Sequence, residues 1–122
     1  MPDALLLVED DDQLARALLR VLRGWGDVRR ARTVAEGLVL VESGDYAALL
    51  SDWDLGEDSA HDVIVRSMRL HPSARRVVLS AHEPTQIRLW LPPGATDAIL
   101  TKPCPAVLVR AAMQLRPSGS RD

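Results

Sequence analysis

Short apolar runs alternate with helix-type segments five times along this sequence, and that alternation restricts the fold more than any other feature. The runs have strand length, and most are continuously apolar, as expected for strands buried on both faces of a sheet. They are residues 4–8, 28–32, 46–51, 77–79 and 98–100. Because the connections are short, right-handed crossovers predict a doubly wound α/β fold: a five-stranded parallel sheet in the order 2-1-3-4-5, the flavodoxin-like arrangement. That order puts the arginine-rich second strand at an edge, where charge prevents pairing with another sheet.

Capping and breaking residues predict the helix boundaries. Asp11 or Asp12 can cap the first helix. Thr33 and Glu36 have capping-box spacing, so each can satisfy a free backbone donor of the other. Pro105 suits the first helical position of the last helix. The expected helices are 12–23, 33–43, 64–70, 84–91 and 105–117.

Length and composition indicate a single domain. The 122 residues predict one domain over 1–117 and a flexible tail over 118–122. A net charge of −2 with scattered basic residues argues against direct binding of nucleic acid or of an anionic membrane. One cysteine excludes an internal disulfide, and the apolar run 4–8 is too short for a signal peptide or a membrane span, so we expect a cytoplasmic protein.

Acidic side chains follow two strands that the predicted order makes neighbours. Glu9 and Asp10 follow the first strand, and Asp52 follows the third. Alone, Asp52 would be read as a turn cap, but carboxylates sharing one site repel unless a cation neutralises them. All these ligands are hard oxygens, so Mg²⁺ is the expected ion, and such a ligand-poor magnesium site implies a phosphoryl group.

A hydroxyl and an ammonium follow two further strands. Ser80 ends the fourth strand, and Lys102, the only lysine, follows the fifth. At the same end of the sheet they can bind the oxygens of a phosphoryl group. Each residue alone would be interpreted as a turn or surface residue. The acids, the serine and the lysine together, each at a strand end and in this order, are a specific indication of a phosphoryl-binding site.

Four segments resemble the signature segments of response-regulator receiver domains, the CheY-like family of two-component signalling. They are Leu6–Asp10, Leu50–Leu55, Val78–His82 and Thr101–Pro103. The resemblance implies that Asp52 accepts a phosphoryl group from a sensor histidine kinase or a phosphotransfer protein in a phosphorelay. It also implies a signalling protein rather than an enzyme, with a downstream output partner and a possible homodimer.

The same resemblance implies roles for the other site residues. Asp10 would bind Mg²⁺ directly and Glu9 through water, with Asp52 and the backbone carbonyl of Asp54 as further ligands. The phosphoryl oxygens would be contacted by Ser80 and Lys102.

The chain also departs from the family pattern. Ile99 stands at the switch position, where many receivers carry an aromatic side chain, so the readout is expected to be unusual. Asp54 and His82 stand where the family tunes the lifetime of the phosphoryl group, although we expect both to face solvent. Ala60 and Gly56 replace a common glycine and a common proline.

Two other functions remain open. The motif Asp52-Trp53-Asp54 resembles the nucleophile motif of haloacid-dehalogenase-type phosphatases, but that family places its second acidic pair after the lysine. The other is a receiver-like module that binds a partner constitutively, without phosphorylation.

Overall fold

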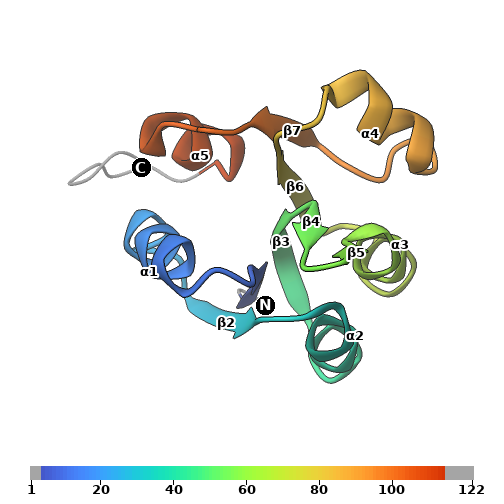
Figure 1. The fold of residues 1–122 in the computed structure, drawn as a ribbon. Coiled ribbons are helices and arrows are strands. Elements are labelled where there is room, and N and C mark those ends of the chain that lie inside the picture. Colours follow the sequence, from blue (N-terminus) through green and yellow to red (C-terminus); the bar gives the residue numbers. More distant parts are fainter. Residues whose placement is uncertain (1–3, 115–122) are drawn as a thin grey trace.

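The structure is a computed structural model that describes residues 4–114, in which one sheet lies between two layers of helices (Figure 1). The strands of this sheet are β1 (Ala4–Val8), β2 (Asp27–Ala31), β3 (Tyr46–Asp52), β6 (Arg75–Ser80) and β7 (Ala98–Thr101). The helices are α1 (Asp12–Val21), α2 (Val34–Glu42), α3 (His61–Leu70), α4 (Pro84–Trp90) and α5 (Ala106–Ala112). Helices α1 and α5 cover one face, and α2, α3 and α4 cover the other.

The sheet confirms the predicted topology. All its strands are parallel, in the order β2-β1-β3-β6-β7. Counted within the sheet, this is the order 2-1-3-4-5. The segment after β3, expected to be a loop, instead forms a two-stranded antiparallel ladder of β4 (Asp54–Leu55) and β5 (Asp58–Ser59). Each of these strands has only two residues, which is too short for a sequence pattern to predict the ladder.

Successive strand residues face opposite helical layers, which explains the uninterrupted apolar runs. Leu5 and Leu50 belong to the core under α1 and α5, whereas Leu6 and Leu49 belong to the core under α2 and α3. All four side chains are buried. Both faces of the central strands therefore contribute to the core, as expected for a parallel sheet covered on two sides.

The capping residues of the first two helices are mostly as predicted. The Asp11 carboxylate accepts a hydrogen bond from the Leu14 amide at the start of α1. Thr33 Oγ1 accepts from the Glu36 amide, as the capping box requires. The Glu36 carboxylate, however, accepts from the amide of Arg32 rather than from that of Thr33. The second hydrogen bond of the capping box therefore comes from the amide one residue before the usual donor.

The last helix differs from the prediction at both ends. Pro105 is the residue before the helix rather than its first residue, with extended backbone (φ −61°, ψ 146°). The helix ends at Ala112, and Gln114 has φ 61°, a left-handed conformation that stops helical continuation. The predicted end at Pro117, the domain boundary there and the tail 118–122 lie outside the described residues. None of the helices within residues 4–114 is long and apolar enough to cross a membrane.

The capping hydrogen bond of Thr33 gives a stability prediction. Thr33→Ala should lower the free energy of unfolding by about 1 kcal/mol, because the Glu36 amide loses its acceptor. Thr33→Ser keeps a hydroxyl at the same position and should retain most of that stability. Urea unfolding followed by circular dichroism compares the three proteins, and equal losses in both variants would contradict the capping role.

Candidate functional site

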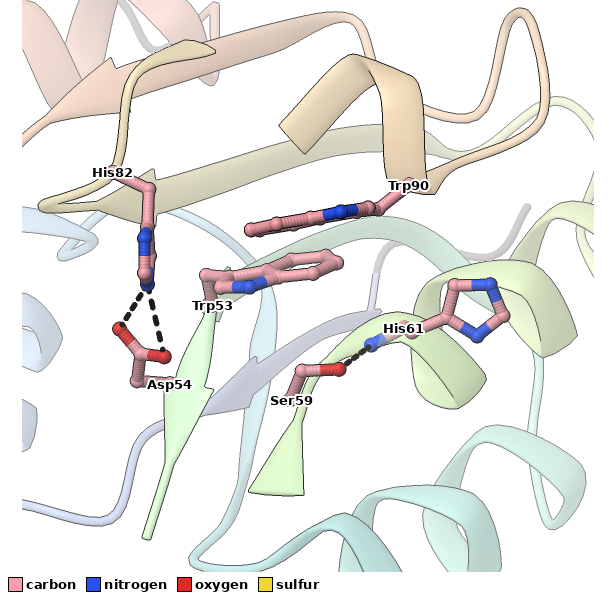
Figure 2. A pocket seen from close by; sticks show the side chains of 6 residues that line it. All are labelled: Trp53, Asp54, Ser59, His61, His82 and Trp90. Atoms are coloured by element: carbon pink, nitrogen blue, oxygen red, sulfur yellow. Dashed lines mark hydrogen bonds and ion pairs between the residues drawn. The ribbon is translucent and has the colours of Figure 1, made fainter. Parts of the chain in front are cut away.

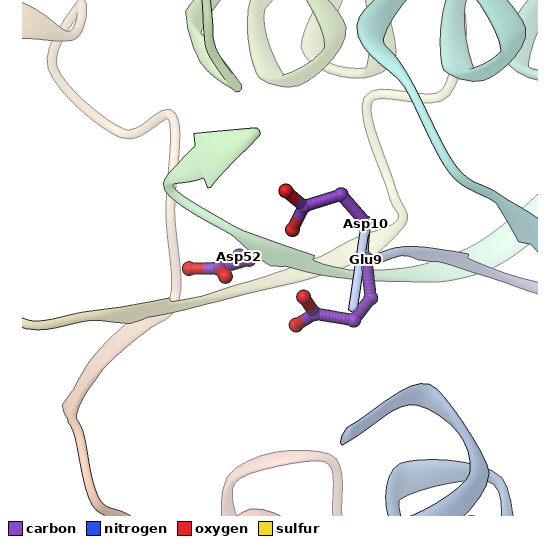
Figure 3. Close-up of side chains that lie close together, drawn as sticks. All are labelled: Glu9, Asp10 and Asp52. Carbon is purple, nitrogen blue, oxygen red and sulfur yellow. The ribbon is translucent and has the colours of Figure 1, made fainter. Parts of the chain in front are cut away.

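Three carboxylates meet at the carboxyl ends of β1 and β3. Glu9, Asp10 and Asp52 each place one carboxylate oxygen within 4.8 Å of the others (Figure 3). Glu9 and Asp52 are buried, with 1% and 5% of their surfaces exposed, while Asp10 is open to solvent. The cluster exists because β1 and β3 are adjacent and parallel, so that both strands end at the same edge.

Glu9 is the least compensated of the three acids. Its Oε2 accepts a hydrogen bond from the Asp11 amide (3.2 Å), but its buried Oε1 has no hydrogen-bond partner among residues 4–114. Burial raises the pKa of the Glu9 carboxyl from 4.5 to about 7, and the neighbouring Asp52 carboxylate acts in the same direction, while the Asp11 amide opposes the rise. A positive charge at this site would therefore favour the ionised form.

Asp52 already has one cationic partner. Lys102 Nζ donates a hydrogen bond to Asp52 Oδ2 at 2.6 Å, an ion pair that lies mostly out of solvent. The Lys102 amide donates to the Ser80 carbonyl (2.9 Å), which ties the end of β7 to the end of β6. Ser80 is fully buried, and its Oγ accepts a hydrogen bond from the His82 amide (2.8 Å).

Backbone groups from outside the cluster hold the acidic pair in place. The Gly56 amide donates to Asp10 Oδ2 (3.1 Å), and Gly56 has φ +67°, a conformation that side chains rarely adopt. Glycine at this position therefore lets the turn after β4 reach Asp10. A proline at this position would have no amide hydrogen and could not make this contact.

Arg30 on the edge strand also contacts the site, which the sequence reading missed. Its Nε and Nη2 donate to the Glu9 carbonyl (3.1 and 2.7 Å), and its Nη1 donates to Asp12 Oδ1 (2.8 Å). Its strand had been interpreted only as a charged edge. Pairing between β1 and β2 places Arg30 beside Leu7, which gives its long side chain access to the turn after β1.

Asp54 is exposed to solvent, as expected, while His82 is partly buried. The sequence analysis did not foresee that the two side chains meet, with His82 Nε2 3.1 Å from Asp54 Oδ2. They line a cavity of about 380 Å³ together with two tryptophans (Figure 2). The Trp53 and Trp90 rings stack in this cavity, and the His82 ring meets Trp90 edge-on. The sequence offered no signal for these contacts, which join residues far apart in the chain.

The donor set fits a hard divalent cation. The cluster consists of carboxylate oxygens, without histidine or cysteine ligands among the described residues, and hard oxygen ligands suit Mg²⁺ or Ca²⁺. The unpartnered Glu9 Oε1 is an independent indication of a cation site. Burying a carboxylate oxygen costs free energy unless a cation or a water bound to it satisfies that oxygen.

Comparison with known proteins identifies the fold. No protein-family model matches this sequence, and no curated protein matches it either. A solved response regulator from Burkholderia pseudomallei, described with a phosphorylated aspartic acid, calcium ion and citrate, matches with a TM-score of 0.80 and 29% identity. The match covers 92% of this chain and 66% of that one, so the chain spans slightly less than two thirds of its length.

Two further structures extend the likeness to other proteins. A CheY-like receiver domain protein from Methanospirillum hungatei JF-1 matches with a TM-score of 0.82 at 19% identity, over 93% of this chain and 92% of that one. The chain has the fold of response-regulator receiver domains. An adenylate cyclase from Rhodopirellula baltica contains it too (TM-score 0.81, 22% identity, 93% and 86% covered), and at such identities the likeness shows the fold alone.

At the switch position of this receiver fold, Ile99 is partly buried and packs against the core under α2, α3 and α4. It pairs with Val78 in the sheet, three residues before Lys102. An aliphatic side chain there has no ring to rotate. The switch role of Ile99 and the ligand role of the Asp54 carbonyl remain predictions.

The raised pKa of Glu9 predicts how stability depends on pH without metal. A folded pKa near 7, above the ordinary 4.5, means that protonated Glu9 favours the folded state. That contribution is complete below pH 4.5 and is lost as the pH rises through 7. In a chelator at pH 8, Glu9→Gln should therefore increase the free energy of unfolding by on the order of 2 kcal/mol.

The matched measurement is urea unfolding of wild type and Glu9→Gln from pH 4 to pH 8. The gain should vanish at the acidic end, where wild-type Glu9 is itself neutral. Glu57→Gln removes an exposed acid from the turn after β4 and controls for the change in net charge. A Glu9→Gln protein that is less stable than wild type at pH 8 would contradict the interpretation that the ionised Glu9 carboxylate destabilises the metal-free fold.

Proposed function

We propose that this domain is the phosphoacceptor of a two-component phosphorelay, with Asp52 taking a phosphoryl group from a phosphohistidine. The donor is a sensor histidine kinase or a phosphotransfer protein. The observation that carries the proposal is the environment of Asp52: a buried carboxylate that pairs with the Lys102 ammonium and lies close to the carboxylates of Glu9 and Asp10.

The chemical step is a displacement at phosphorus. A carboxylate oxygen of Asp52 attacks the phosphorus atom, and the phosphorus–nitrogen bond of the donor breaks. The electron pair of that bond goes to the donor imidazole. Lys102 offsets the negative charge that gathers on the phosphoryl oxygens, and the hydroxyl of Ser80 can donate a hydrogen bond to one of them. The protein contributes mainly positioning and electrostatics.

Mg²⁺ is the proposed cofactor. Asp10 would hold it directly and Glu9 through water, with Asp52 and the backbone carbonyl of Asp54 completing the protein ligands. When bound, the ion neutralises the carboxylates and the incoming phosphoryl group. Wild-type Glu9 then becomes ionised at neutral pH, because a nearby cation favours the charged form.

Phosphorylation adds a charge of about −2 beside Ser80 at pH 7. We propose that Ser80 moves towards this charge and that the segment between β6 and α4 follows. The readout is then an altered surface that binds a downstream output protein or domain, or a second copy of the chain. Such a role places the protein in the cytoplasm with its kinase and gives it no substrate turnover of its own.

The order of acids in the chain favours this function over a phosphatase. The acidic pair at positions 9 and 10 precedes Asp52, and after Lys102 the next acid is Asp122. A haloacid-dehalogenase-type phosphatase needs its second acidic pair after the lysine. A constitutive binding module would leave the buried acids unexplained, since burying charge that serves nothing is costly.

The decisive test is intact mass after incubation with acetyl phosphate. Wild type should gain one phosphoryl group when Mg²⁺ is present and none in a chelator. Asp52→Asn should gain none, because an amide does not replace the carboxylate nucleophile. Asp58→Asn, in the neighbouring β4–β5 ladder, is the control and should be phosphorylated normally.

Hydrolysis of p-nitrophenyl phosphate separates the alternatives. Continuous turnover that depends on Asp52 would support a phosphatase. A folded wild-type protein with neither mass gain nor turnover would overturn the phosphoacceptor proposal in favour of constitutive binding.

A further inference from the structure

The acceptor turn is joined to α4 by a stack of two tryptophans. Trp53 directly follows Asp52, and Trp90 is the last residue of α4. Their ring centroids lie 5.7 Å apart at an interplanar angle of 16° (Figure 2). Trp53 is only 4% exposed, whereas Trp90 is 48% exposed, so Trp90 covers Trp53 from the solvent side.

His82 connects the same helix end to Ser80. Its ring meets Trp90 edge-on, with centroids 5.7 Å apart at 79°, and its Nε2 lies 3.1 Å from Asp54 Oδ2. Its backbone amide donates to Ser80 Oγ at 2.8 Å. Two routes therefore run from the site to Trp90, one through Trp53 and the other from Ser80 through His82.

Helix α4 has few other attachments, so these contacts matter to its position. It has seven residues, its N-terminus has no side-chain cap, and Ile87 is its one buried residue. An element with little buried surface opens and shifts more readily than the core elements. The tryptophan stack joins its carboxyl-terminal end to the turn after β3, next to Leu91, the residue after the helix, which is buried in the same core.

We propose that Trp90 couples the phosphorylation state of Asp52 to the position of α4, and so supplies the aromatic readout that position 99 lacks. This inference rests on the proposed phosphoacceptor function. When Ser80 Oγ turns towards a phosphoryl oxygen, the amide of His82 must follow or lose its acceptor. The His82 ring then changes its packing on Trp90, and the stack on Trp53 transmits any movement of the acceptor turn to the same helix end.

The chain provides its own spectroscopic reporters for this coupling. It has three tryptophans, and Trp25 packs against the core on the opposite face of the sheet. In protein labelled with 5-fluorotryptophan, acetyl phosphate with Mg²⁺ should shift the ¹⁹F resonances of Trp53 and Trp90 and leave that of Trp25 unchanged. Single tryptophan-to-phenylalanine variants assign the three signals, and intact mass of the same sample reports phosphorylation.

Variants at the helix end separate coupling from mere stability. Trp90→Ala should still gain one phosphoryl group, but the phosphorylation-induced amide shifts of residues 85–89 should fall to less than half of those in wild type. Trp90→Phe keeps a ring and should retain most of them. Leu89→Ala is the matched control, since Leu89 is 84% exposed on the same helix and should leave the shifts unaltered.

Each result decides a different claim. A mass gain with unmoved Trp53 and Trp90 resonances, or with full amide shifts in Trp90→Ala, overturns the coupling and leaves the phosphoacceptor function intact. No mass gain in folded wild type overturns the proposed function, and this inference with it.

Discussion

Repulsion between carboxylates at the ends of β1 and β3 is the constraint on which the site depends. Glu9 and Asp52 are both buried, and parallel pairing of their strands forces them to the same edge. Ionised groups in such a position are costly unless cationic or hydrogen-bonding partners face them. Lys102 donates a hydrogen bond to Asp52, and the Asp11 amide donates one to a single oxygen of Glu9. The other oxygen of Glu9 has no partner among residues 4–114, and this is the feature that favours a cation at the site.

The surrounding elements hold this arrangement through backbone contacts. Arg30, on the edge strand, donates hydrogen bonds to the Glu9 carbonyl. The Gly56 amide, in the turn after β4, donates one to the Asp10 carboxylate. The acids are thus restrained by two separate parts of the sheet edge, the edge strand and the turn after β4. Restraint of this kind is what positioning in phosphoryl transfer requires, because the protein supplies geometry more than covalent chemistry.

The fold could be predicted from sequence because its signals are local. Each strand is an apolar run, and the chain order of Glu9, Asp52, Ser80 and Lys102 follows directly from the order of the strands. The pair of Asp54 with His82 was missed because it joins two loop residues that look solvated in sequence. The Trp53–Trp90 stack was missed because a contact between residues 37 positions apart leaves no periodic pattern in the sequence.

Boundary errors also have a physical origin. Pro105 was expected inside the last helix, because proline fits the first helical position, yet its backbone is extended and the helix begins one residue later. Propensity permits both placements, so it does not decide between them. Helix ends are therefore the part of this fold that sequence specifies least.

The pairing of Lys102 with Asp52 has a consequence for the chemical reactivity of the chain. Lys102 is the single lysine, so a reagent that acylates side-chain amines has one target in these 122 residues. That target is the ammonium paired with the Asp52 carboxylate. Acetylation, acylating cross-linkers and coupling to an activated ester would each remove the charge paired with Asp52, so that lysine modification of this chain would act at the candidate site itself.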